Sequence, residues 1–174
     1  MGISISIFDA DDLRDNLSEL GSLLSDCVHA GASISFVLPY SSEEGETFWR
    51  KKVLPGVEEG GTVLLVARDG TRIAGTVQLD CDTPPNQPHR AEVRKLLVHP
   101  DFRRRGIARL LMAELEHIAS RRNRSLLTLD TRTGDKAEPL YASMGYQTAG
   151  IIPGFCRDPF VDRLDGTTIM YKTI

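Results

Sequence analysis

The sequence lacks a long apolar run, an excess of basic charge and a dense set of cysteines. A membrane-spanning helix needs about 20 consecutive apolar residues, and no segment of the 174 residues approaches that length. The formal net charge is −3 and the isoelectric point is about 5.8. We therefore expect neither a nucleic acid nor a membrane surface as partner.

The cysteines and histidines are too few and too scattered for a disulfide framework or a metal site. There are three cysteines, at positions 27, 81 and 156, and four histidines, at positions 29, 89, 99 and 117. We expect buried thiols in a reducing cytoplasm, and no metal. No basic region precedes ISISIF at residues 3–8, so we also expect no signal peptide.

What the sequence does contain is an ordinary globular composition, with 41% hydrophobic and 26% charged residues. We find no internal repeat, no low-complexity tract and no interdomain linker. The length suits one domain, so we expect residues 1–174 to form a single domain.

Alternating and continuous apolar runs predict strands at 3–7, 62–68, 72–80, 91–99, 125–131, 146–150 and 167–173. Helical spacing predicts a helix capped near Asp9 to Asp12 and running to Val28, and another at 107–118. A third helix should start at Ser41 or Ser42 and be ended or kinked by Pro55. A fourth, within 134–145, has Asp135 and Glu138 as a capping box and Gly145 as its C-cap.

The element order predicts a mixed sheet of the α/β class with helices on its faces. Short turns such as Asp69-Gly70 imply antiparallel pairing of the early strands. The helix between strands 91–99 and 125–131 implies a right-handed parallel crossover.

The start of the helix at residue 107 carries the wrong charge for a bare helix N-terminus, which prefers Asp or Glu. Arg103, Arg104 and Arg105 precede it, and Arg109 lies one turn on. Unpaired N–H groups at a helix N-terminus form an anion site, and Gly106 lets a bulky ligand approach the backbone. The cluster therefore predicts a site for a polyanion such as a pyrophosphate.

These residues resemble a known family. VHPDFRRRGIA, residues 98–108, is similar to the V-x-P-x-x-(Q/R)-x-x-G-x-(G/A) motif of the GNAT family of N-acetyltransferases. AEPLYASMGY, residues 137–146, is similar to the family's later A-x-x-x-Y-x-x-x-G-(F/Y) element. HAGAS (29–33), AEVRKLLV (91–98), LDT (129–131) and PGFC (153–156) resemble the tabtoxin-resistance type of acetyltransferase within that family.

The resemblance implies the acyl-CoA N-acyltransferase fold, in which a mostly antiparallel sheet has a parallel strand pair splayed at the cofactor site. It implies acetyl-CoA as co-substrate and an acyltransferase activity of class EC 2.3.1.-. The residues that it places around the coenzyme are Leu97, Val98, Arg103, Arg104, Arg105, Gly106, Ile107, Ala108 and Arg109. Many relatives also carry an Asn near the start of the later helix, and TRTGDK at 131–136 has none.

For catalysis the resemblance implies that Tyr141 is the general acid that protonates the leaving thiolate. Glu92 and Asp130 are the candidates for the general base, directly or through a water chain. Two carboxylates would also attract a cationic amine. The structural alternatives are an ion pair of Glu92 with Arg90 or Arg94, and a turn-forming role for Asp130.

The expected reaction is acetylation of a primary amine of a small molecule by direct attack in a ternary complex. An amino-acid-like toxin or antibiotic would make the protein a detoxification enzyme. The alternatives are a protein or peptide N-acetyltransferase and a non-catalytic acyl-CoA sensor. The pattern is compatible with a monomer or a homodimer.

Overall fold

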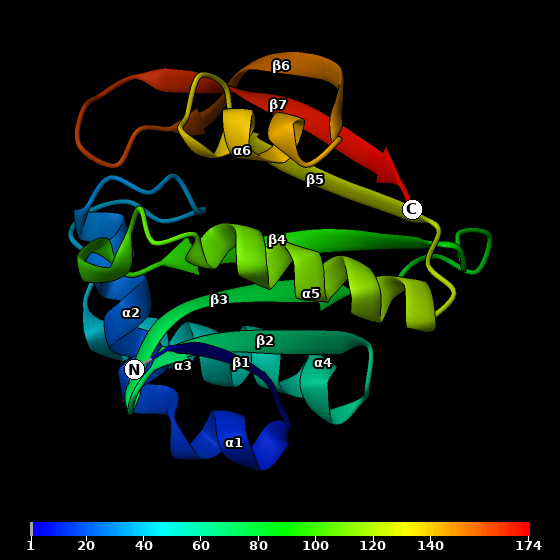
Figure 1. The fold of residues 1–174 in the computed structure, drawn as a ribbon. Helices are drawn as coiled ribbons and strands as arrows, with labels where there is room; N and C mark the ends of the chain where they lie inside the picture. Colours follow the sequence, from blue (N-terminus) through cyan, green and yellow to red (C-terminus); the bar gives the residue numbers. More distant parts are fainter. Residues whose placement is uncertain (1) are drawn as a thin grey trace.

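The computed structural model describes residues 2–174, and its central element is a seven-stranded mixed sheet with helices on both faces (Figure 1). The strands lie in the order β1-β2-β3-β4-β5-β7-β6. Their bounds are β1 (Ile3–Phe8), β2 (Thr62–Asp69), β3 (Arg72–Asp80), β4 (Arg90–Val98), β5 (Leu126–Arg132), β6 (Gln147–Arg157) and β7 (Leu164–Thr173). The predicted class, a mixed sheet between helices, is confirmed.

The pairing of the strands follows the expected pattern. Each strand from β1 to β4 pairs antiparallel with the next strand along the chain. β7 pairs antiparallel with β5 on one side and with β6 on the other. β4 and β5 form the only parallel pair in the described part of the chain, and their register covers only residues 90–92 with 126–128. Beyond Glu92 and Thr128 the two strands separate, which leaves room between them inside the sheet.

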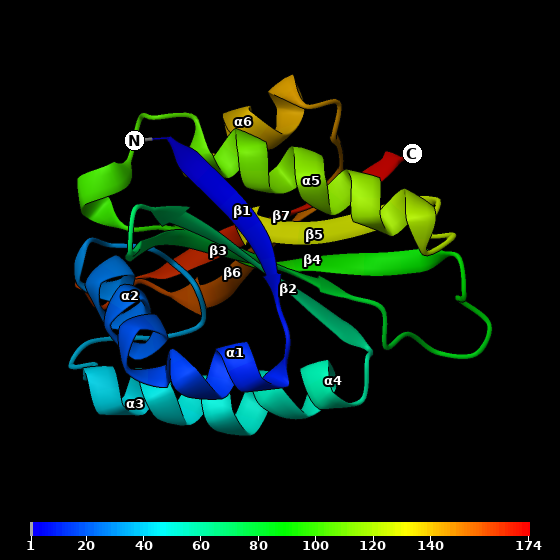
Figure 2. The same ribbon diagram turned by 60° about the horizontal axis from the view of Figure 1, so that its bottom comes forward.

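Two apolar layers hold the helices against the sheet. On one face α5 (Ile107–Arg121) presents Ile107, Leu111, Met112, Leu115 and Ile118, all buried against side chains of β2, β3 and β4. α6 (Ala137–Ser143) packs on the same face, as Figure 2 shows. On the other face lie α1 (Ala10–Asp15), α2 (Leu17–His29), α3 (Ser42–Phe48) and α4 (Leu54–Glu58).

The N-terminal helices are shorter than the sequence predicts. Asp9 does cap the first helix, in a capping box with Asp12. The prediction of a single helix is wrong, because the helix is interrupted at Asn16. This residue has φ of −111°, and its side-chain amide donates to the Asp12 carbonyl at 2.7 Å. Local hydrogen bonding by Asn competes with the helical ladder in this way.

The two predicted helices that start near residue 41 and within residues 134–145 differ from prediction as well. The Ser41–Glu44 capping box is confirmed, but Pro55 does not end the helix, because it falls in the first turn of α4, where no donor is needed. A π-helical segment at Trp49–Val53 joins α3 to α4. The Asp135–Glu138 capping box is wrong.

α6 is capped differently from that prediction. It begins at Ala137 without a side-chain cap, and the Glu138 carboxylate accepts from the Gly134 amide at 2.9 Å instead. Gly145 does follow the helix end in the left-handed conformation, with φ of +90°. β6 reaches Arg157, well past the predicted strand 146–150.

Candidate functional site

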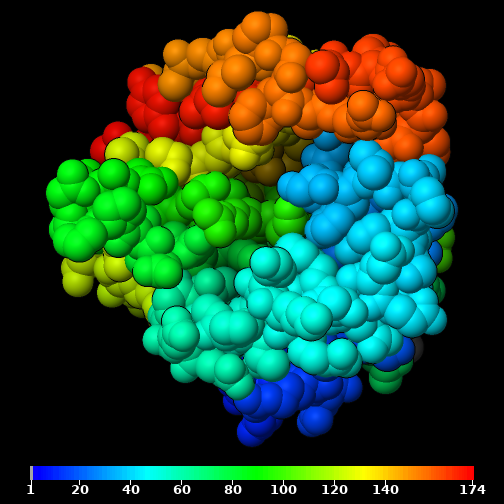
Figure 3. Space-filling view, turned by 180° about the vertical axis from the view of Figure 1, so that it is seen from behind, coloured from blue at the N-terminus to red at the C-terminus, as the bar shows by residue number. Residues whose placement is uncertain are grey.

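The separation of β4 and β5 opens a cleft of about 1510 Å³ that runs through the sheet. In the space-filling view of Figure 3, the hollow is bordered by the first third of the chain in blue to cyan, the centre in green, and the C-terminal strands in orange. Its volume exceeds the roughly 300–1,000 Å³ of a typical small-ligand site. The cleft therefore has room for two substrates side by side.

One end of the cleft is formed by the N-terminus of α5. Gly106 is the N-cap residue with φ of +77°, and no side chain caps the helix. A Cβ at Gly106 would meet nothing within 4 Å, so the backbone is open to a ligand there. Uncapped N–H groups at the start of a 15-residue helix are the donors that the predicted anion site requires.

Three of the four predicted arginines line this end of the cleft, and one does not. Arg103 donates from Nε to the Val98 carbonyl at 3.3 Å, and Arg109 donates to Ser143 Oγ on α6 at 2.7 Å. Arg104 is exposed and has φ of +63°. Arg105 instead pairs with Asp69 on the β2–β3 hairpin at 2.7 Å and lies outside the residues that line the cleft. The structure thus separates Arg105 from the other predicted coenzyme residues.

The inner wall of the cleft is the end of β4, where the strand bulges. Leu97 and Val98 keep their register with Thr76 and Gly75, while Arg94 faces Gln78. Lys95 and Leu96 are therefore the two residues opposite a single residue of β3, and Lys95 has a left-handed φ of +50°. Leu97, Val98, Ile107 and Ala108 line the cleft, where the sequence places them.

Cys27 lies beneath the same strand end. Its thiol donates to the Val98 carbonyl at 3.6 Å. Burial raises the pKa of Cys27 to about 11, against the opposing charge of Arg103. The thiol is protonated at neutral pH and is therefore no nucleophile.

Tyr141 on α6 lines the cleft and is 6% exposed. Its ring packs against that of Tyr146, with the ring centroids 5.8 Å apart. Burial raises the pKa of the Tyr141 phenol above its usual range, and the charges of Asp130 and Asp135 act in the same direction. The hydroxyl is therefore protonated at neutral pH and has a proton to donate.

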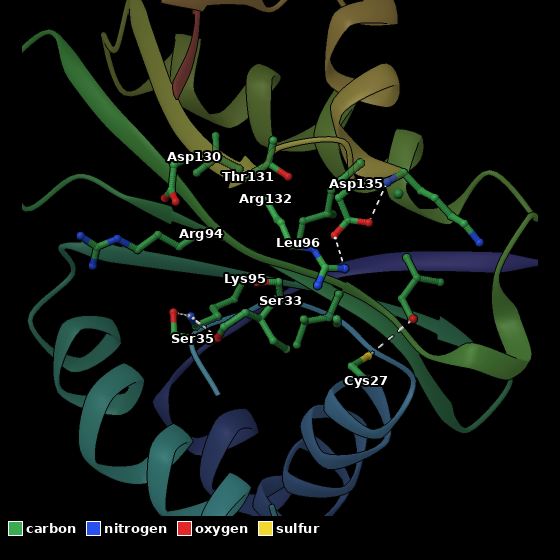
Figure 4. Close-up of a pocket in the computed structure, with 18 of the residues that line it drawn as sticks. Cys27, Ser33, Ser35, Arg94, Lys95, Leu96, Asp130, Thr131, Arg132 and Asp135 are labelled. Atoms are coloured by element: carbon green, nitrogen blue, oxygen red, sulfur yellow. Dashed lines mark hydrogen bonds and ion pairs between the residues drawn. The ribbon is translucent and has the colours of Figure 1, made fainter. Parts of the chain in front are cut away.

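Glu92 and Asp130 face the cleft from the two separating strands. Glu92 accepts from Arg94 at 3.0 Å, as the structural alternative predicted, and Arg94 also pairs with Asp80 at 2.7 Å. Asp130 accepts from the hydroxyl of Thr167 on β7 at 2.8 Å. Figure 4 shows Asp130 and Arg94 at the gap between β5 and β4.

Contacts that sequence reasoning missed bridge residues that line the cleft. Arg132, at the end of β5, donates to the Gly31 carbonyl at 3.3 Å and pairs with Asp158 at 3.3 Å. Ser33 Oγ lies 3.7 Å from Cys156 Sγ on β6. These contacts join the loop between α2 and α3, called the α2–α3 loop (residues 30–41), to the C-terminal strands. No local pattern signals them, because the partners lie 26 to 123 residues apart.

Within residues 2–174, no three His, Cys, Asp or Glu side chains are placed to hold a metal ion. None of the helices in that range combines the length and apolar character needed to span a bilayer.

Comparison with known proteins agrees with this geometry. Residues 60–148 match the family described as the acetyltransferase (GNAT) domain. The fold is similar to that of a ribosomal-protein-alanine N-acetyltransferase from Brucella melitensis, at 22% identity, TM-score 0.78 and coverage of 98% of this chain and 99% of that one. An N-acetyltransferase from Staphylococcus aureus has 14% identity, TM-score 0.81 and 99% coverage of both chains.

A third similar structure carries a ligand. It is a Salmonella typhimurium protein solved with its cofactor acetyl-CoA, at 16% identity, TM-score 0.76 and coverage of 99% of this chain and 94% of that one. At these identities the three structures share the fold with this chain.

The environment of Tyr141 predicts a loss of stability at alkaline pH. Because the folded pKa is raised, the contribution is fully present below the unfolded pKa of about 10 and is lost as pH rises above it. Above pH ~10, each such tyrosine lowers the free energy of unfolding by about 1.4 kcal/mol per pH unit. In urea unfolding between pH 10 and pH 11, the slope of the free energy of unfolding against pH should be smaller in Tyr141→Phe than in the wild type by about 1 kcal/mol per pH unit.

Tyr146→Phe provides the matched comparison, since burial and Glu116 raise the pKa of Tyr146 in the same way. Both variants should have the pH dependence of the wild type below pH 9. An unchanged slope in Tyr141→Phe would contradict the buried environment of its phenol.

Proposed function

This chain belongs to the GNAT family of acetyltransferases, and we propose that it transfers the acetyl group of acetyl-CoA to a primary amine of a small molecule. The observation that carries the proposal is the uncapped N-terminus of α5, set beside arginines that face the cleft. A ligand with several phosphates supplies the negative charge that this helix end lacks. Tyr141 lies in the same cleft.

The residues present fit the coenzyme. We assign its phosphates to the α5 amides from Gly106 to Arg109, and to the Arg103, Arg104 and Arg109 side chains. Backbone amides near Leu97 and Val98 are assigned to the thioester carbonyl and the pantetheine arm. Arg105 is left out of this set, because its guanidinium is held by Asp69.

The reaction needs an unprotonated amine, although a typical alkyl ammonium has a pKa near 10. We assign the removal of its proton to Glu92 or Asp130, directly or through water. The amine nitrogen then forms a bond to the thioester carbonyl carbon, and the carbon–sulfur bond breaks. Tyr141 gives its proton to the departing thiolate. The nitrogen loses its second proton to solvent as the amide forms, and the phenolate takes a proton back from solvent.

A small acceptor is favoured by the contacts that bridge the cleft. Arg132 and the Ser33–Cys156 contact join the α2–α3 loop to the C-terminal strands, and a bridged cleft suits a small molecule better than an extended peptide. Glu92 and Asp130 line the same cleft and give it carboxylates suited to a cationic amine. We therefore propose an amino-acid-like toxin or antibiotic, as in the tabtoxin-resistance type.

The biological setting follows from the same proposal. Acetylation of a toxin or antibiotic is detoxification. Cys27, Cys81 and Cys156 are free thiols, which supports a reducing cytoplasm. We also propose that residues 1–174 act as one catalytic domain, either as a monomer or as a homodimer.

A thiol-release assay tests the reaction. Purified protein with acetyl-CoA should release free coenzyme thiol in the presence of small amines from a panel of amino acids, aminoglycosides and alkyl amines. Peptides, including one with an N-terminal alanine, form the second arm. Faster release with peptides would overturn the small-molecule acceptor. Binding of acetyl-CoA without release by any amine would indicate a sensor.

The phosphate assignment predicts a coenzyme-binding defect in Arg104→Ala. A charge-assisted hydrogen bond is worth about 1.5–3 kcal/mol, so the Kd for acetyl-CoA should rise at least about tenfold. The shift in melting temperature with acetyl-CoA concentration measures it. Arg121→Ala, which removes the same charge from the other end of α5, should leave the Kd unchanged. Equal Kd values in the two variants would refute the assignment.

The role of Tyr141 predicts a purely kinetic defect. General acid catalysis contributes typically 10²–10⁴-fold, so Tyr141→Phe should lower kcat by roughly that factor. The Kd for acetyl-CoA should stay within about twofold of the wild type, because the variant removes only the hydroxyl. An unchanged kcat would remove Tyr141 from the mechanism.

A further inference from the structure

The bulge of β4 carries a lysine where the backbone conformation favours glycine. Lys95 has φ of +50° and lies with Leu96 opposite one residue of β3. A non-glycine residue in this region is strained and persists only when its surroundings hold it in place. Thr76 holds the backbone, because its hydroxyl donates to the Lys95 carbonyl at 3.3 Å.

The Lys95 side chain is held by the α2–α3 loop. Its ammonium donates to the Ile34 carbonyl at 3.0 Å and to Ser35 Oγ at 3.1 Å. The nitrogen also lies 5.4 Å from the Phe36 ring centroid and 5.5 Å from that of Phe48, within cation–π range. The four contacts join the bulge to one loop and to the end of α3.

Ser35, which accepts one of these hydrogen bonds, has the same kind of strained backbone as Lys95. Ser35 has φ of +80°, so the hydrogen bond between Lys95 and Ser35 joins two non-glycine residues with left-handed backbones. Strain of this kind clusters at functional sites because the rest of the structure maintains it. Figure 4 shows Lys95 and Ser35 together in the cleft, below Leu96 of the bulge.

The position of this contact relates it to the acceptor amine. Leu96, the residue after Lys95, lines the cleft next to the residues assigned to the thioester, and residues 30–36 of the α2–α3 loop line the same cleft. We propose that Lys95 is a positioning residue that fixes the α2–α3 loop against the β4 bulge and thereby sets the fit of the acceptor amine. This inference rests on the proposed acetyl transfer.

The proposal accounts for the presence of lysine at this bulge. Glycine would relieve the backbone strain but would leave the loop without its four contacts. Burial lowers the pKa of Lys95, and Arg94 acts in the same direction, while Asp130 and Glu92 oppose it. A buried ammonium is retained only when it has partners, and here the loop supplies them.

Three substitutions separate the loop contact from the backbone strain. Lys95→Met keeps a side chain of similar length without its charge. Lys95→Gly relieves the strain and also removes the contacts. Lys95→Arg keeps the charge and the donors and should restore much of the function. Lys51→Met, at an exposed lysine of the Trp49–Val53 segment, is the matched control.

Acceptor kinetics provide the first measurement. Lys95→Met and Lys95→Gly should both raise the KM for the acceptor about tenfold or more, a ratio equivalent to about 1.4 kcal/mol. The Kd for acetyl-CoA should stay unchanged, which also shows that both variants fold. Lys95→Arg should lie nearer the wild type, and Lys51→Met should match it. A wild-type KM in Lys95→Gly would overturn the proposal.

Amide hydrogen exchange provides a measurement that does not need turnover. Amides of residues 31–38 should exchange about tenfold faster in Lys95→Met than in wild type or Lys51→Met, because local opening follows the contacts that hold a loop. If exchange in Lys95→Met is unchanged while the wild type carries out acetyl transfer, the positioning role of Lys95 is overturned and the proposed function stands. Wild-type protein that releases no thiol with any amine would overturn the proposed function and the acceptor role together.

Discussion

The separation of β4 from β5 is the constraint on which the rest of the structure depends. Their parallel register covers three residues of each strand, and the sheet is open beyond it. An open sheet interior exposes backbone groups that must find other partners. The cleft places these groups beside the N-terminus of α5, whose first amides have no side-chain cap. The separation of the two strands thus brings backbone groups of the open sheet close to the uncapped amides at the start of α5.

Charged side chains of both signs line the cleft. An uncapped helix terminus lies beside Arg103, Arg104 and Arg109, on a chain whose net charge is −3. Glu92 and Asp130 line the same cleft, together with Arg94 and Lys95. In the proposed reaction the helix terminus and its arginines would hold the anionic coenzyme, and the two carboxylates would attract the cationic amine. Tyr141, buried and protonated, lines the cleft with them.

The walls of the cleft depend on contacts between parts of the chain that are far apart in sequence. Arg132 and Lys95 extend from β5 and β4 to the same loop, at the Gly31 and Ile34 carbonyls. Each of these half-buried cations is bonded to a neutral carbonyl, and Arg132 has the Asp158 carboxylate in addition. The position of the loop therefore depends on side chains of the two strands that form the cleft.

The sequence alone determined the strands, the parallel crossover and the arginine-rich helix start, because periodicity, turns and caps act over a few residues. Tyr141 became a candidate through the resemblance of residues 137–146 to the family's motif. The sequence did not determine the break at Asn16, where a side chain competes with the helix, or the separation of Arg105 from its neighbours. Asp69, which decides the position of Arg105, lies 36 residues away. The role of Lys95 also required the tertiary structure, since its partners are about 60 residues distant. Packing alone brings such groups together, and no local pattern records it.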